Sequence, residues 1–132
     1  MNLRELFEAC LAENNNNNVR AAQQFIVKAK KENPDVKMKD CMITAGFDEK
    51  SKQTFRNSIV IPVRNRIAKI KFNLSEDTIQ RLFGRSQEDL TDEEKNTKKN
   101  IQELLPGRTR TTAAKNMDHI DSLLAVVEEN AE

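Results

Sequence analysis

Apolar residues recur along most of this chain at intervals of three and four, which places them on one face of an α-helix. The clearest case is residues 2–12, whose apolar positions are Leu3, Leu6, Phe7, Cys10 and Leu11. Similar spacing predicts helices at about 19–31, 36–45, 63–72, 75–83, 91–105 and 113–129. Only three glycines and three prolines occur in 132 residues, which favours long regular elements over a turn-rich β fold. The pattern therefore predicts an all-α protein, a small multi-helix bundle.

Capping and helix-breaking residues predict the ends of the first helices. Five asparagines in a row, residues 14–18, are typical of a flexible low-complexity linker. Asn18 is the expected N-cap of the second helix, and Pro34 ends that helix. Asp35 is the expected cap of the third helix, and Gly46 suits its C-terminal end, where a left-handed backbone is common.

Later boundaries follow the same rules. Ser51, Ser75 and Thr91 are the expected N-caps of three further helices. The β-branched triplet 59–61 is compatible with either helix or extended chain. Pro62 is expected to break or kink the chain at this point.

Charge is unevenly distributed, although the whole chain has a formal net charge of only +1. Residues 20–72 carry a net charge of +8, while 1–19 and 73–132 carry −2 and −5. A concentrated basic block is expected of a surface that meets polyphosphate. We therefore divide the chain into an N-terminal helix with its asparagine-rich linker (1–18), a basic region (19–72) and an acidic helical region (73–132).

The candidate recognition motif is residues 38–56, MKDCMITAGFDEKSKQTFR. It predicts a short helix, a turn at Ala45-Gly46-Phe47 and a second helix, the order found in helix-turn-helix units. Apolar residues on both sides of the turn are expected to hold the two helices together. The second helix then offers four side chains to the major groove, namely Lys52, Gln53, Arg56 and Asn57. Arginine favours guanine edges, whereas asparagine and glutamine favour adenine.

This stretch resembles the pipsqueak-like helix-turn-helix segment of transposon-related and eukaryotic DNA-binding proteins. The resemblance covers about a third of the chain, with 19–31 as the leading helix and 36–57 as the unit. It departs from that pattern at Met42, where a small residue is usual, at Lys52, where an apolar residue is common, and in the longer, more acidic loop 48–50. The resemblance implies a DNA-binding protein with a role in transcription regulation.

A second basic stretch, RNRIAKIK, follows at 64–71. Its four basic side chains are expected to hold phosphates, which positions a protein on DNA without specifying sequence. They are Arg64, Arg66, Lys69 and Lys71. Arg108 and Arg110 could add a flexible clamp.

Other chemistry finds little support in the sequence. His119 has no nucleophile nearby in sequence, no glycine-rich phosphate loop occurs, and no metal-ligand spacing is present. We therefore expect no enzymatic activity, no metal, no cofactor and no small-molecule substrate. Cys10 and Cys41 are expected to be free, buried thiols. No apolar run reaches the length of a membrane span and the N-terminus does not resemble a secretory signal, so we expect an intracellular protein, nuclear if eukaryotic and otherwise cytoplasmic.

Three alternatives stay open at this point. The basic block could bind RNA or phosphate without reading sequence. The chain could instead be a helical interaction or regulatory module, a homodimer among the possibilities, that uses the stripes of the first helix (Leu3, Phe7, Leu11) and of the last helix (Ile120, Leu124, Val127). The acidic C-terminal half could also act as a nucleic-acid mimic. Duplex DNA is the favoured partner.

Overall fold

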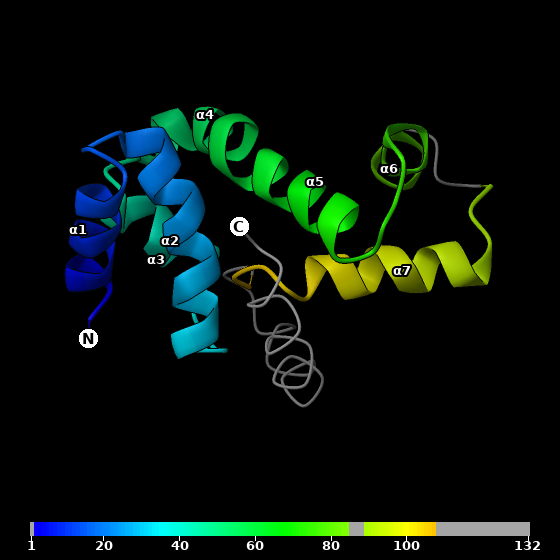
Figure 1. The fold of residues 1–132 in the computed structure, drawn as a ribbon, viewed down its shortest axis with the longest axis horizontal. Coiled ribbons are helices and arrows are strands. Elements are labelled where there is room, and N and C mark those ends of the chain that lie inside the picture. Colours follow the sequence, from blue (N-terminus) through cyan, green and yellow to red (C-terminus); the bar gives the residue numbers. More distant parts are fainter. Residues whose placement is uncertain (1, 85–88, 108–132) are drawn as a thin grey trace.

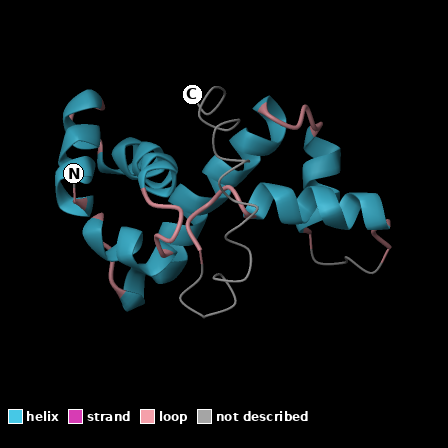
Figure 2. Cartoon of the chain, turned by 90° about the horizontal axis from the view of Figure 1, so that it is seen from below, coloured by secondary structure: helices cyan, strands magenta, loops and turns pink. Residues whose placement is uncertain are grey.

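A computed structural model describes residues 2–84 and 89–107. These residues form a small all-α bundle in which no β-strand occurs (Figure 2). Helices α1 (Leu3–Glu13), α2 (Asn18–Glu32) and α3 (Met38–Thr44) lie together at one end, and α6 (Glu76–Phe83) and α7 (Asp92–Gln102) lie at the other. One long helical segment, which ends in α5 (Ile61–Ile70), connects the two groups (Figure 1).

The core of the first group forms between α1 and α2. Phe7 and Phe25 are both buried, and their rings meet edge to face with centroids 5.3 Å apart. The predicted stripe on α1 therefore packs inside the protein: Leu3 and Leu11 are partly buried against the same core. Of this stripe, Phe7 is therefore inside the protein and is not available to a partner.

The asparagine run forms a turn between α1 and α2. Asn14 ends α1, and its side-chain amide donates to the Cys10 carbonyl at 2.7 Å. Asn15 and Asn16 have φ angles of 54° and 60°, a left-handed conformation that asparagine tolerates better than most residues. Asn17, one residue before the expected Asn18, is the N-cap of α2.

A tight turn joins α3 to the next helix. Gly46 has a φ of +92°, which glycine adopts readily, and Phe47 packs its ring 5.1 Å from that of buried Phe55. One capping prediction here is wrong. Lys37, not Asp35, precedes α3, and it makes no side-chain cap because a lysine ammonium group can donate but cannot accept from backbone amides. Ser51 is the N-cap residue of α4 (Lys52–Phe55), as predicted, although its side chain makes no hydrogen bond to that helix. Its hydroxyl instead forms a capping box with Asp48 across the 3₁₀ turn η1 (Glu49–Ser51) that leads into α4.

Pro62 does not break the helix, and the triplet 59–61 is helical. A π-helical turn, η2 (Arg56–Val60), joins α4 to α5 without interruption. The buried stripe explains this turn, since its members recur every four residues, as Phe55, Ile59, Val63 and Ile67. At about 100° per residue, each four-residue step passes a full turn by about 40°, so three steps move the stripe by about 120° around a regular α-helix. One extra residue in a wider turn removes most of this displacement.

A side chain from α2 supports the π turn. The Gln23 amide nitrogen donates to the Ser58 carbonyl at 2.8 Å. In a regular α-helix that carbonyl would accept from the amide of residue 62, and proline has no amide hydrogen. Gln23 therefore gives this carbonyl a donor beside Pro62, which has no amide hydrogen to offer it in an α-helical register.

Helices α6 and α7 of the second group each begin at a capped N-terminus, and the chain after α7 reaches back to the first group. Ser75 and Thr91 are N-caps, as predicted, and Glu94 completes a capping box with Thr91. Ile101, Leu104 and Leu105, the apolar end of the predicted 91–105 helix, are all buried. Beyond α7, the Gly107 carbonyl accepts from the Met38 amide at 2.6 Å, and the Gly107 amide donates to the Val36 carbonyl at 3.0 Å. This pairing ties the end of the described chain to the start of α3.

Several predictions fall on residues that the structure does not describe. The helix 113–129 with its apolar stripe, the basic loop at Arg108 and Arg110, and His119 lie outside the described residues. Among those described, Lys30 belongs to the predicted basic region 19–72 but does not contribute to its surface. It is 1% exposed, and its ammonium group donates to the Pro34 carbonyl at 2.9 Å.

Candidate nucleic-acid interface

Four of the predicted DNA contacts lie together at the start of the long helix. Lys52, Gln53, Arg56 and Asn57 are all exposed, and no ion pair engages Lys52 or Arg56 within the described ranges. Their spacing of one and four residues places them on adjacent rows of one helix face. The Gln53 amide donates to the Asn57 side-chain oxygen at 3.1 Å, so these two side chains are already aligned.

The π turn brings Arg64 into line with Arg56. Eight residues of a regular α-helix turn about 80° beyond two full turns, and the extra residue of the π turn largely cancels this excess. The two guanidinium groups are close enough to repel each other. Burial first, and then the charge of Arg56, lower the pKa of Arg64. Arg56 and Arg64 therefore form one row of positive charge.

Arg64 is held by its neighbours, unlike a mobile surface arginine. Its guanidinium carbon lies 3.9 Å from the centroid of the Phe83 ring. Its Nε and one terminal nitrogen donate to the Asn65 side-chain oxygen at 3.2 and 3.1 Å. Lys98 of α7 approaches the same ring, with its nitrogen 5.7 Å from the centroid. Sequence reasoning missed this role of Phe83, because helical spacing assigned the residue only to an apolar stripe.

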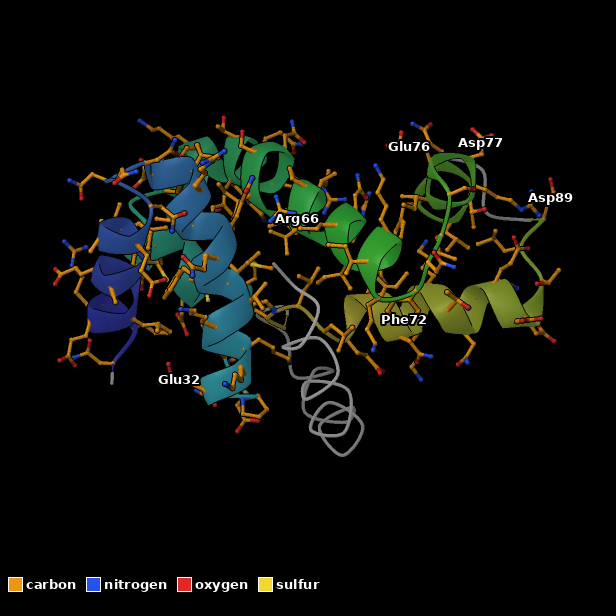
Figure 3. The ribbon with its side chains drawn as sticks, viewed as in Figure 1. Glu32, Arg66, Phe72, Glu76, Asp77 and Asp89 are labelled. Carbon is orange, nitrogen blue, oxygen red and sulfur yellow. The ribbon has the colours of Figure 1, made fainter. Side chains whose placement is uncertain are left out.

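The remaining predicted phosphate contacts do not join this row. Lys69 forms an ion pair with Glu76 of α6, which also lowers the pKa of that carboxyl. Arg66 is exposed, but two residues turn a helix by about 200°, so it lies on the opposite side of α5 from Arg64. Figure 3 shows Arg66 below α5, whereas Glu76 lies above on α6. Lys71 is partly buried just beyond the end of α5.

A groove of about 290 Å³ lies between α5 and α6, beside the Arg56–Arg64 row. Arg64, Asn65 and Lys69 line it from α5, and Gln80 and Phe83 line it from α6. The side chains of Ile61, Ile79 and Glu76 complete its walls together with Gly84. The groove thus combines hydrogen-bond donors with apolar surface, a mixture found in small-ligand sites.

Other candidate chemistry is sparse in the described part of the chain. Cys10 and Cys41 are free and buried, as predicted, and burial raises the pKa of Cys41 to about 12. Within residues 2–84 and 89–107, no cluster of three or more histidine, cysteine or acidic side chains could hold a metal ion. In the same ranges, none of the helices combines the length and apolar character that a membrane span requires.

Comparison with protein-family models, with curated proteins and with solved structures finds no match to this chain. The functional interpretation therefore depends on the geometry of the site alone.

Proposed function

We propose that this protein binds duplex DNA without enzymatic activity, through the helix face that carries Lys52, Gln53, Arg56 and Asn57. The supporting observation is that these four side chains are exposed on one face, which begins after the turn at Gly46 and the 3₁₀ turn η1. From 51 to 72 the chain has six basic residues and no acidic one. A helix with this face suits the major groove, and transcription regulation is the role we favour.

The residue types fit the two tasks of a DNA reader. Arg56 can pair with a guanine edge, while Gln53 and Asn57 can pair with adenine once they release each other. Lys52, at the start of the long helix, and Arg64, about two turns beyond Arg56, suit phosphate contacts. Arg66 plays no part in this face, because it lies on the other side of α5, and Lys69 lies outside the Arg56–Arg64 row, beside Glu76 of α6.

Fluorescence anisotropy with a random-sequence duplex at several salt concentrations tests the proposal. We expect affinity to fall steeply with salt, since each phosphate contact contributes about one unit to the logarithmic salt slope. Arg56→Ala should weaken binding to a selected sequence by about 1–3 kcal/mol. Arg56 is a cleaner probe than Arg64, because Arg64→Ala also removes the contact with Phe83.

The matched control is Arg4→Ala. Arg4 is exposed on α1, paired with Glu8 and remote in sequence from the proposed face. Equal losses of DNA affinity in Arg4→Ala and Arg56→Ala would show that the loss reflects net charge and not the position of Arg56. Absence of duplex binding at low salt would refute the proposal.

One observation favours a second candidate function, a helical protein-interaction module. Ile43 on α3 is 55% exposed and Val19 at the start of α2 is 42% exposed, although both are large apolar residues. The hydrogen bond from Asn18 to the Ala45 carbonyl brings the start of α2 to the end of α3. Sedimentation equilibrium of wild type and Ile43→Ser separates the two functions, since concentration-dependent association lost in the variant favours the interaction module.

A further inference from the structure

Two cations from different helices meet at the Phe83 ring, and a third lies farther along the long helix. Arg64 stacks on the ring, Lys98 approaches it from α7, and Arg56 follows Arg64 in the row along the helix. Lys98 has its pKa lowered, by burial and then by the charge of Arg64. These charges repel one another, so an anion placed among them is stabilised by all of them.

Arg64 is already positioned for such an anion. Its guanidinium carbon lies over the Phe83 ring, and the Asn65 oxygen accepts from two of its nitrogens. A guanidinium group has five N–H donors in a rigid fork, so further donors are available to a ligand. Because the fork is held in place, binding loses less conformational freedom than at a mobile arginine.

We infer that the groove between α5 and α6 is a phosphate-binding site centred on Arg64, with Asn65, Lys69 and Gln80 as additional donors. The oxygens of a phosphate match the arginine fork, which recognises planar pairs of oxygens. Lys69 can join because its ion pair with Glu76 is exposed and such pairs contribute little stability. Ile61, Ile79 and Phe83 leave apolar wall for the group attached to the phosphate.

This site deepens the proposed function if the phosphate belongs to bound DNA, and it stands alone if the phosphate belongs to a small molecule. On the first reading, the duplex lies along the Arg56–Arg64 row and one backbone phosphate enters the groove. On the second, a free phosphate-bearing molecule occupies it. Both sources share one chemistry, a phosphate oxyanion bound by a fixed guanidinium.

The test is a titration with inorganic phosphate and then pyrophosphate, followed by ¹H–¹⁵N NMR at matched ionic strength in sodium chloride. We expect saturable shifts in the side-chain amides of Asn65 and Gln80 and in the Arg64 Nε–H. Gln80→Glu adds a negative charge to the groove at an exposed position, and should weaken phosphate binding by about five- to tenfold. Gln102→Glu, at an exposed position near the end of α7, is the matched control and should bind as wild type does.

A second variant keeps the test decisive if Gln80→Glu fails to fold. Arg64→Lys keeps the charge and loses the fork, and should weaken phosphate binding severalfold while the NMR spectrum stays dispersed. The same variants are then measured with the duplex. A parallel loss of DNA affinity in Gln80→Glu assigns the phosphate to DNA, and unchanged DNA affinity assigns it to a small molecule. Phosphate binding without any duplex binding would refute the proposed function and support the site.

Two results would overturn the site. One is absence of saturable shifts at Asn65, Gln80 and Arg64 with either anion. The other is equal affinity in wild type, Gln80→Glu and Arg64→Lys, which would show that phosphate binds elsewhere on the chain. Either result would leave duplex binding through Arg56 untouched.

Discussion

The hydrogen bond from Gln23 to Ser58 gives a sharp test of how the long helix passes Pro62. Gln23→Ala removes the donor at 2.8 Å from a partly buried carbonyl and offers no replacement. Loss of such a bond costs about 1–2 kcal/mol, because the acceptor stays desolvated in the folded state. With a urea m-value of about 1.5 kcal/mol/M, the unfolding midpoint should fall by roughly 1 M.

The mechanism predicts more than a loss of stability, since it names the missing partner. Pro62→Ala restores an amide hydrogen, and a regular α-helical register here would direct it to the Ser58 carbonyl. Gln23→Ala should therefore cost much less in the Pro62→Ala background than in wild type. The expected coupling between the two substitutions is about 1 kcal/mol, well above the error of additivity at independent sites.

Urea unfolding of wild type, Gln23→Ala, Pro62→Ala and the double variant, followed by far-ultraviolet circular dichroism, measures this coupling. Gln102→Ala is the control, because Gln102 is exposed, and its effect should stay within about 0.5 kcal/mol. An equal cost of Gln23→Ala in both backgrounds would refute the explanation of the π turn. If Gln23→Ala in the wild-type background costs no more stability than Gln102→Ala does, the stabilising role of the hydrogen bond is refuted.

Three further predictions concern the turn, the second group and the core. Gly46→Ala should destabilise the fold by about 1–2 kcal/mol in thermal unfolding, because alanine disfavours a φ of +92°. No atom lies within 4 Å of the added Cβ, so the cost comes from the backbone conformation alone. An unchanged unfolding midpoint would contradict this prediction. The hydrogen-bonded ion pair with Arg81 lowers the pKa of Glu94 from 4.5 to about 2, so it stabilises the fold above about pH 4.5 and fades as the pH falls to 2. In Arg81→Ala, NMR titration should move that pKa back toward 4.5, and the stability difference from wild type should vanish near pH 2; a Glu94 pKa still near 2 would show that Arg81 is not the cause. Cys41 is fully buried with a pKa of about 12, so a thiol reagent should modify it only at the rate of unfolding, and rapid labelling of the native protein would refute its burial.

Local signals in the sequence were sufficient for the helices themselves. Apolar spacing identified the segments that become α1, α2 and α6, and Ser75 and Thr91 cap the helices that they were expected to cap. These signals work because a cap and its helix lie within a few residues of each other. The exposed Lys52–Asn57 face was predictable for the same reason, since polar residues at one and four intervals define a face without any distant partner.

Tertiary structure decided what depends on partners far away in sequence. The chain passes Pro62 as a helix because Gln23, from another helix, supplies a donor to Ser58. Arg64 became the centre of a candidate site because α6 places Phe83 against it, while Lys69 left the predicted face for Glu76. Lys30 is buried despite its charge because its ammonium group reaches the Pro34 carbonyl. A sequence specifies helical faces through local spacing, whereas the pairing of those faces is determined by packing between segments that only the folded chain brings together.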